Sequence, residues 1–253
     1  MHNLTLTNLG QTRSAHQHNH LLLTADTFVR APLPGMKACT AVVHVGPALG
    51  AAFTEYTAEF DAGGELGSTA SQRFIYVVEG AVTVELDGKR SELGARGYAY
   101  FPEGLSHRVA ATTPTTRVAV FEKPYKAVKT VEQPRAIVSS EDEVSSHALN
   151  DDSDLQVKCL LPDEFSFDFA VNTMVFHPGT ALSMVEMHVM EHGLIMLEGG
   201  GIYRLGDSWY PVTAGDFIWM GPWCPQWFGA IGKVPAKYLI YKDWNRHPLA
   251  GAR

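Results

Sequence analysis

The feature that most constrains this 253-residue chain is an internal repeat, in which the second half follows the pattern of the first at an offset of about 119 residues. A glycine turn, a leucine a short way beyond it, a glycine before an aromatic run and a closing apolar run recur in the same order. The matched segments are Val78-Glu79-Gly80 with Leu197-Glu198-Gly199, Leu86 with Leu205, Gly97 with Gly215, and 120–123 with 239–242. Such a repeat predicts two copies of one folding unit, each about 110 residues long.

Each copy has the character of an antiparallel β unit. Short runs rich in β-branched and aromatic residues alternate with glycine-containing turns, and Asp87-Gly88 between two runs is a strong hairpin signal. The predicted strands are 41–45, 53–60, 74–78, 82–86, 98–101, 117–121, 167–171, 173–176, 202–205, 217–220 and 237–241. Strands at this spacing predict an all-β fold in which each copy is a β-sandwich, jelly roll or barrel.

Two segments fall outside the copies. Residues 1–30 are polar and irregular, and we expect an N-terminal arm whose tract His16-Gln17-His18-Asn19-His20 is solvated. Residues 126–155 hold acidic runs and few aromatics, so we expect a connector with a solvated face and a short docked strand near 136–138. The two predicted domains are therefore 31–125 and 156–253.

Composition and charge exclude several classes of function. The net charge is −7 and no basic stripe appears, which argues against a nucleic-acid partner. The longest apolar runs are too short to span a bilayer, and the first residues show no secretory signal. Cys39, Cys159 and Cys224 are far apart and form no CxxC motif, so no disulfide framework is expected. We expect a cytoplasmic protein without a membrane partner.

A candidate metal site lies in the stretch 186–192 of the second copy. On a strand, Glu186, His188 and His192 would project from one face because side chains alternate with period two, with His192 continuing that face or lying beyond a local bend. Two imidazoles and a carboxylate on one face form half of a shell for a divalent metal. The alternative interpretation is a pair of core histidines that the carboxylate satisfies.

A helix over the same stretch would have a different meaning. Residues 184–198 contain many helix-forming side chains, and on a helix His188, Glu191 and His192 would match the HxxEH signature of inverted zincin metallopeptidases. The repeat favours a strand, because the counterpart segment 67–79 ends in a run of strand type. Gly193 would also weaken a helix.

The residues around this stretch resemble the cupin family, whose domains carry G(x)5HxH(x)3–4E(x)6G followed by G(x)5PxGxxH. The second copy keeps this framework with altered ligands: Glu186 replaces the first histidine, His192 replaces the glutamate, and Gln226 replaces the last histidine. The residues that carry the match are Gly179, Glu186, His188, His192, Gly199, Gly215 and Gln226. In the first copy His107 fits the second motif, but Gly67, Thr69 and Arg73 stand where the second copy has its ligands. The resemblance therefore implies a bicupin whose N-terminal cupin has lost its metal site.

The whole arrangement is similar to a narrower family, the (S)-ureidoglycine aminohydrolases, which are bicupins that bind Mn²⁺ in the C-terminal cupin. The resemblance covers nearly the whole chain and includes 12–13, 33–35, 161–165, 209–212 and 241–246. It implies one Mn²⁺ per chain, bound by Glu186, His188, His192 and Gln226. A mixed set of carboxylate, imidazole and amide donors suits octahedral Mn²⁺ or Fe²⁺ with open positions better than a closed zinc site.

The same resemblance implies the reaction, in which (S)-2-ureidoglycine and water give (S)-ureidoglycolate and ammonia during purine (allantoin) catabolism. Glu186 and Lys242 are the candidates for moving protons, although a metal-bound carboxylate is a poor base. Tyr203 and Tyr238 are the candidates for binding the ureido or carboxylate oxygens. Lys123 matches Lys242 in the sequence repeat, which suggests that this lysine is partly structural.

Two other functions stay open, because cupins serve many chemistries. One is another bicupin metalloenzyme, such as an iron or manganese dioxygenase, which oxygen consumption would reveal. The other is a non-catalytic cupin that binds a small molecule, against which the ligand set of the second copy argues. We also expect a homo-oligomer, because cupins often pair their sheets edge to edge or exchange N-terminal arms.

Overall fold

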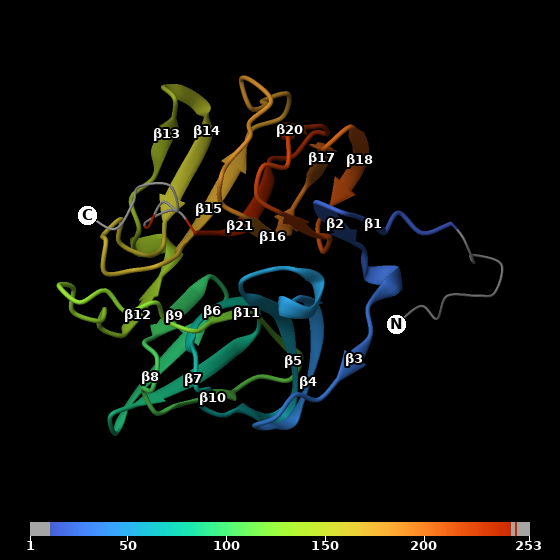
Figure 1. The fold of residues 1–253 in the computed structure, drawn as a ribbon. Coiled ribbons are helices and arrows are strands. Elements are labelled where there is room, and N and C mark those ends of the chain that lie inside the picture. The colour runs from blue at the N-terminus through green and yellow to red at the C-terminus, as the bar shows by residue number, and fades with distance from the viewer. Residues whose placement is uncertain (1–10, 244–245, 247–253) are drawn as a thin grey trace. The chain divides into compact units, whose positions relative to one another are not determined.

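The computed structural model describes residues 11–243 and residue 246, and these form an all-β protein as expected (Figure 1). The helical segments in this described part are three short 3₁₀ turns, η2 (Ala25–Thr27), η3 (Pro47–Leu49) and η4 (Glu141–Glu143). None of the helices described is long and apolar enough to cross a membrane. The chain divides into two compact units, which are described separately below.

The N-terminal unit comprises residues 29–145 and 159–170. Its strands are β3 (Arg30–Ala31), β4 (Met36–Val45), β5 (Thr54–Leu66), β6 (Gln72–Glu79), β7 (Ala81–Leu86), β8 (Lys89–Gly94), β9 (Gly97–Phe101), β10 (His107–Ala111), β11 (Thr116–Lys123) and β12 (Ile137–Ser140). They form one sheet in the order β12-β9-β6-β11-β5-β10-β7-β8, with β4 paired to β5 and β3 to β4. Alternate residues such as Ile75, Val77, Val118 and Val120 point into its core, as strand geometry requires.

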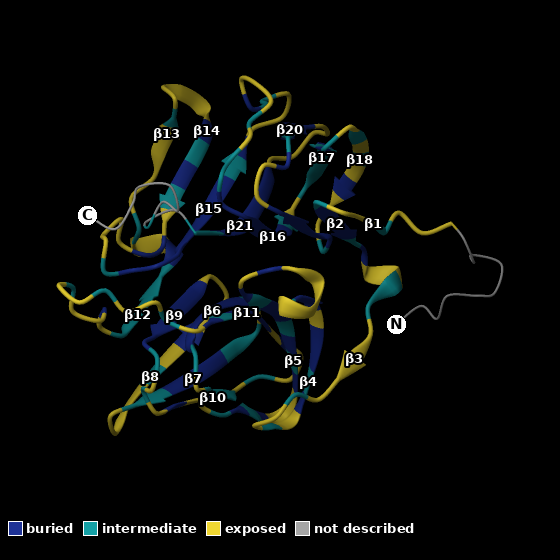
Figure 2. Cartoon of the chain, in the orientation of Figure 1, coloured by how far each residue is buried: buried dark blue, intermediate teal, exposed yellow. Residues whose placement is uncertain are grey.

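The C-terminal unit comprises the described residues up to 28, 146–158 and those from 171 onward. Its strands are β1 (Ala15–Gln17), β2 (His20–Leu23), β13 (His147–Leu149), β14 (Asp152–Cys159), β15 (Ala170–Phe176), β16 (His192–Glu198), β17 (Gly200–Leu205), β18 (Ser208–Thr213), β19 (Phe217–Met220), β20 (Gln226–Ala230) and β21 (Ala236–Lys242). Eight strands form a sheet in the order β1-β2-β19-β16-β21-β15-β14-β13, and β18-β17-β20 form a second sheet. Both sheets contribute side chains to one buried core, which includes Leu194, Tyr203 and Phe228. Figure 2 shows the buried residues of these strands in dark blue.

The predicted repeat is visible strand by strand, because β6 to β11 of the N-terminal unit correspond to β16 to β21 of the C-terminal unit. The turn after the first strand of each series needs glycine. Gly80 has φ +79° and Gly199 has φ +62°, and a Cβ atom at Gly199 would lie 2.4 Å from the carbonyl oxygen of Pro235. The recurring glycines therefore mark the same tight turn in both units.

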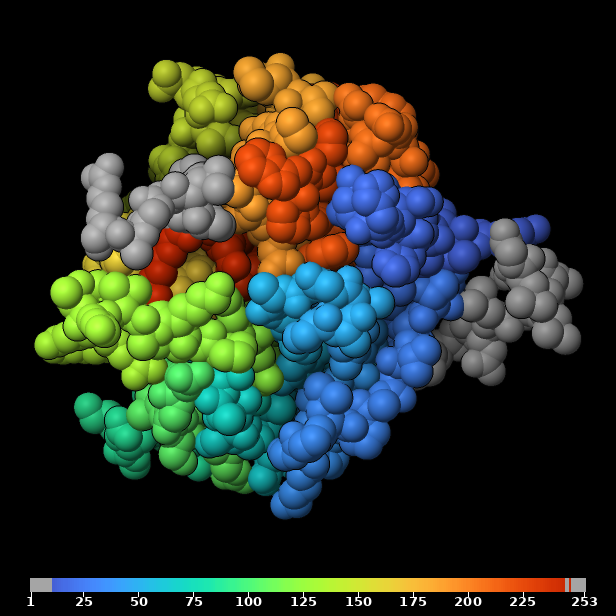
Figure 3. Space-filling model, viewed as in Figure 1, coloured from blue at the N-terminus to red at the C-terminus, as the bar shows by residue number. Residues whose placement is uncertain are grey.

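The N-terminal segment differs from the expected solvated arm. Residues 15–23 form the hairpin β1–β2, and β2 pairs antiparallel with β19, placing Leu22 fully in the core of the C-terminal unit. Figure 3 shows this blue segment against the orange atoms of the same unit. His16 and His18 are exposed as expected, whereas His20 is buried and its Nε2 lies 3.0 Å from the Tyr210 hydroxyl. Pairing with a distant strand, rather than any local signal, orders this segment.

The connector and the segment after it also have specific places. In the expected connector, β12 pairs with β9 in the N-terminal unit, while β13 and the following β14 extend the large sheet of the C-terminal unit. The predicted strand over 167–171 is wrong for its first three residues, since β15 begins at Ala170. Phe167 and Phe169 instead pack edge-on against Tyr100, with ring centroids 5.2 and 6.0 Å away. These two aromatic side chains therefore pack within the N-terminal unit instead of forming a strand.

Candidate functional site

The stretch 186–192 is neither a continuous strand nor a helix. Glu186 forms an isolated antiparallel bridge with Gln226, in which each backbone N–H donates to the other residue's carbonyl oxygen at 2.8 Å. The chain then bends at 189–190, and His192 begins β16. Apart from this bridge, the expected strand over 186–191 is absent. The Glu186 and His188 side chains nevertheless contact each other, and His192 lies beyond a bend, one of the two places expected for it. The helix needed for a zincin motif is absent from these residues.

Strand alternation brings the remaining candidates to the same interior. His192 shares the inward face of β16 with Leu194 and Met196, and it is the direct partner of Lys242 on β21. Lys242 in turn shares its face with Tyr238 and Ile240. Gln226 shares its face with Phe228, which is the direct partner of Tyr203. The candidate residues thus converge from β16, β17, β20, β21 and the segment before β16.

The four candidate ligands differ in burial, with two half-buried and two almost fully buried. His188 Nε2 lies 3.1 Å from Glu186 Oε2, and both side chains are 29% exposed. The His188 and His192 rings have centroids 5.1 Å apart, and His192 and Gln226 are both 4% exposed. Burial, followed by the charges of His188 and Lys242, lowers the pKa of His192 to about 3. This histidine is therefore neutral at pH 7, the form that a metal ligand needs.

Tyr203 and Tyr238 lie deep in the same interior. Their exposed fractions are 1% and 2%, and burial raises the pKa of both phenols, with a further contribution from the nearby Glu186 carboxylate. Both hydroxyls consequently stay protonated at neutral pH. They are available as hydrogen-bond donors rather than as bases.

The structure corrects the expected equivalence between Lys242 and Lys123. In the N-terminal unit Arg73, the counterpart of His192, pairs with Glu122, whereas Lys123 pairs with Gln72. Lys123 is buried and donates to the Asp168 carbonyl oxygen at 3.2 Å. The last strand is thus shifted by one residue relative to the sequence repeat, so the structural counterpart of Lys242 is Glu122. The role of Lys123 says nothing about that of Lys242.

In the N-terminal unit an internal hydrogen-bonded network occupies the corresponding position. The Arg73 guanidinium lies 2.7 Å from Glu122 and donates to the Gly67 carbonyl oxygen at 2.6 Å. It also donates to His107 Nε2 at 2.9 Å, while Tyr56 donates to Glu122 at 2.8 Å. Since Arg73 has only donors, His107 Nε2 must accept, and its Nδ1–H donates to the Leu105 carbonyl oxygen at 2.8 Å.

This network predicts an acid-sensitive contribution to stability from His107. Burial, and to a lesser degree the Arg73 charge, lowers the pKa of His107 to about 4, so the unfolded chain takes up this proton first as the pH falls. Stability from this residue is therefore full above its unfolded pKa of about 6.5 and declines between about pH 6.5 and 4. We expect His107→Gln, which introduces the residue of the other unit, to flatten that decline in urea unfolding across this pH range. His147→Gln, at an exposed site, is the control; equal pH slopes in all three proteins would contradict the assignment.

The donor set fits a divalent metal in its chemistry. It offers a carboxylate, two imidazoles and an amide oxygen, and His192 Nδ1 is a buried nitrogen without a hydrogen-bond partner. Across the described residues, no three or more His, Cys, Asp or Glu side chains are arranged to hold a metal ion. Gln226 falls outside those residue types, and Glu186 and His188 contact each other directly. Glu186, His188, His192 and Gln226 therefore have the donor chemistry for a metal, but their arrangement in the described structure is not that of a formed metal site.

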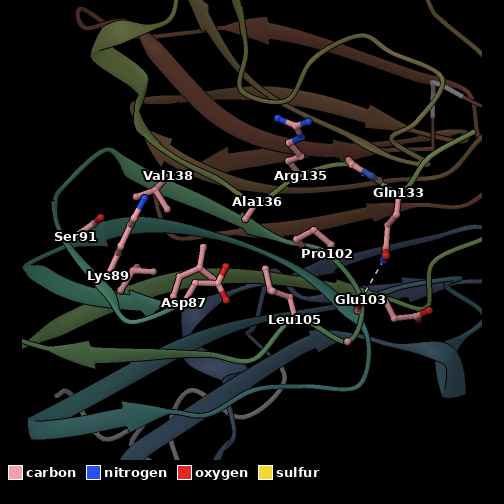
Figure 4. A pocket seen from close by; sticks show the side chains of 14 residues that line it. Asp87, Lys89, Ser91, Pro102, Glu103, Leu105, Gln133, Arg135, Ala136 and Val138 are labelled. Atoms are coloured by element: carbon pink, nitrogen blue, oxygen red, sulfur yellow. Dashed lines mark hydrogen bonds between the residues drawn. The ribbon is translucent and has the colours of Figure 1, made fainter.

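A groove of about 670 Å³ in the N-terminal unit contains none of these candidates (Figure 4). Its charged lining residues are Asp87, Lys89, Glu103 and Arg135, and Gln133 closes one side by donating to the Glu103 carbonyl oxygen at 3.2 Å. Opposite charges balance along the groove, and no set of like groups converges on one point. The candidate residues for the chemistry are those of the C-terminal interior, and none of them lines this groove.

Comparison with known proteins supports the division of the chain into two repeated units. The cupin domain model matches residues 58–121 and 172–241, one region in each unit. The chain is 40% identical over 244 residues to the probable (S)-ureidoglycine aminohydrolase of Oryza sativa subsp. japonica, covering 95% of this chain and 78% of the rice protein. It is also 40% identical over 244 residues to the (S)-ureidoglycine aminohydrolase of Arabidopsis thaliana, covering 95% and 80%.

A solved structure shows the same fold over nearly the whole chain. The crystal structure of Ylba from E. coli superposes with a TM-score of 0.84 at 29% identity, covering 96% of this chain and 98% of that protein. The expected bicupin architecture is therefore confirmed, and the expected family is confirmed by relatives that match 95% of this chain. This chain belongs to the (S)-ureidoglycine aminohydrolase family of bicupin hydrolases.

Proposed function

We propose that this protein is a manganese-dependent hydrolase that converts (S)-ureidoglycine and water to (S)-ureidoglycolate and ammonia in purine catabolism. The observation that carries the proposal is that the candidate residues lie around one interior of the C-terminal unit, namely Glu186, His188, His192, Gln226 and Lys242. The chain also has relatives named (S)-ureidoglycine aminohydrolase. Glu186, His188, His192 and Gln226 would hold one metal ion per chain. When bound, Mn²⁺ supplies electrophilic stabilisation of negative charge on the substrate and fixes its orientation.

The side chains then divide the proton transfers. In the reaction the C–N bond to the amine breaks, the oxygen of water bonds to the same carbon and loses one proton, and the amine leaves as ammonia after gaining one proton. The Lys242 ammonium is the group proposed to donate that proton, since it carries no duty as a ligand. Glu186 is the second candidate for moving protons, and metal binding would weaken it as a base.

The two buried tyrosines are proposed to bind the substrate. Tyr203 and Tyr238 are protonated donors on the inward faces of β17 and β21, near the Glu186 carboxylate. Ureido and carboxylate oxygens are acceptors and match such donors. The proposed partners are accordingly a small ureido substrate and further copies of this chain, with neither nucleic acid nor membrane involved.

The proposal predicts metal-dependent ammonia release that His188→Ala abolishes. Ammonia is measured from freshly generated (S)-ureidoglycine, with spontaneous decay subtracted, using metal-free protein, protein loaded with Mn²⁺, and the variant. His188 touches Glu186 and would supply one of four ligands, so its loss should reduce both bound Mn²⁺ and turnover by at least about tenfold. His147→Ala, on the exposed strand β13 of the same unit, should behave as wild type.

The contrary outcomes separate the other functions. Metal binding without ammonia release above background would refute the aminohydrolase assignment, and oxygen consumption by the same protein would indicate a dioxygenase. Failure to bind Mn²⁺ or any other divalent ion would refute the metal site. Full activity of His188→Ala would refute its place among the ligands.

A further inference from the structure

Asn172 lies beside Lys242 on the wall of the same interior. It belongs to β15, which neighbours β21 in the large sheet, and it shares the inward face of β15 with Met174 and Phe176. The residue is 4% exposed. A polar amide at this depth requires partners, because an unsatisfied buried polar group destabilises the fold.

Both ends of the Asn172 amide find partners in one orientation. The amide oxygen accepts from Lys242 Nζ at 3.0 Å, and the amide nitrogen donates to the Val171 carbonyl oxygen at 3.0 Å. The second bond fixes the amide plane, so the oxygen presents a fixed acceptor to the lysine. This pairing was not visible in the sequence, where Asn172 belongs to no motif.

We propose that Asn172 is a positioning residue that directs the Lys242 ammonium toward the leaving amine of the substrate; this rests on the proposed function above. Lysine carries its charge on a flexible four-carbon stem, and productive proton transfer needs the donor within hydrogen-bond reach of the leaving amine. The Asn172 amide oxygen accepts from Nζ and so restrains the position of the ammonium.

The N-terminal unit provides the contrast. There the counterpart of Lys242 is Glu122, which is bound by the Arg73 guanidinium and the Tyr56 hydroxyl. Those partners immobilise a charged group by an ion pair. In the C-terminal unit the neutral Asn172 amide oxygen accepts from the Lys242 ammonium.

The test is a double-mutant cycle in the full-length, Mn²⁺-loaded protein. Wild type, Asn172→Leu, Lys242→Met and the double variant are compared for kcat, KM, bound Mn²⁺ and melting temperature. We expect Asn172→Leu to lower kcat about 10- to 100-fold with KM changed less than about threefold, because misplacing a catalytic group costs mainly turnover. In the Lys242→Met background the same substitution should have no further effect on kcat, since Asn172 acts through the lysine.

Controls separate positioning from packing. Met174→Leu changes an inward neighbour on the same strand at nearly constant volume and should leave kcat unchanged. Asn172→Ala replaces the leucine variant if the latter fails to fold. An unchanged kcat in either Asn172 variant, or independent losses that multiply in the double variant, would overturn the proposal.

A crystal structure of the Asn172 variant provides a readout independent of turnover. The Lys242 Nζ atom is expected to leave its wild-type position or to occupy several. If it stays in place, the positioning role is wrong whatever the reaction. If it moves while wild type releases no ammonia, the assigned reaction fails and the restraint on Lys242 stands.

Discussion

Lys242→Met is expected to lower kcat for ammonia release by about 10²- to 10⁴-fold, the usual contribution of a positioned general acid or base. The lysine faces His192 directly across β16 and β21, and its Nζ is held 3.0 Å from the Asn172 amide oxygen. Methionine keeps the unbranched apolar stem and removes only the ammonium, so packing should change little. The measurement is steady-state ammonia release together with bound Mn²⁺ per chain.

Metal content distinguishes proton transfer from assembly of the site. Lys242 is outside the ligand set, so the variant should bind Mn²⁺ as wild type does while its turnover falls. Lys233→Met, an exposed lysine in the same unit, should retain full activity. Normal turnover of Lys242→Met with normal metal content would remove Lys242 from the chemistry and leave Glu186 as the remaining proton carrier.

The placement of Lys242 also shows where sequence reasoning fails. Glycine turns and alternating apolar runs are local signals, and they located the repeat and the inward position of His192. Register between distant strands is not local, and a slip of one residue moves every side chain to the other face of a sheet. The sequence repeat aligns Lys242 with Lys123, whereas the register of β21 and β11 against their neighbouring strands aligns Lys242 with Glu122. In the correct alignment of the two strands, Arg117 corresponds to Lys237 and Phe121 to Tyr241, which are residues of similar type.

Residues that depend on distant partners were likewise beyond prediction. Leu22 becomes a core residue only because β2 pairs with β19, nearly two hundred positions away along the chain. Asn172 acquires a meaning only when β21 lies beside β15. By contrast, Glu186, His188, His192 and Gln226 were predicted as ligands from spacing matched to a family motif, and the structure joins two of them, Glu186 and Gln226, by a backbone bridge.

The two units satisfy the same interior position in opposite ways. In the C-terminal interior the candidate ligands are acceptors, namely a carboxylate, imidazoles and an amide, which would bind a cation under the proposed function. In the N-terminal interior Arg73 itself supplies the cation, with Glu122, His107 and the Gly67 carbonyl oxygen as its acceptors. An internal guanidinium in place of a metal should therefore matter for stability, and this can be measured.

Arg73→Met is expected to destabilise the N-terminal unit by about 3 kcal/mol, at the lower end of the range for breaking a buried ion pair because Glu122 is 20% exposed. Hydrogen exchange of peptides from β6 and β11 would then accelerate about a hundredfold. Arg117→Met removes the ion pair of Arg117 with Glu79, which joins the same two strands. The Arg117 and Glu79 side chains are 47% and 48% exposed. This control should change stability by less than about 1 kcal/mol.

A third variant separates the lost charge from the lost packing. Arg73→Met combined with Glu122→Leu removes both charges, and it should recover much of the stability because no carboxylate is left without its partner. If Arg73→Met alone exchanges as slowly as Arg117→Met, the guanidinium does not hold this interior together. If the double variant is no more stable than Arg73→Met, the stabilisation comes from the packing of the arginine stem rather than from its pairing with Glu122.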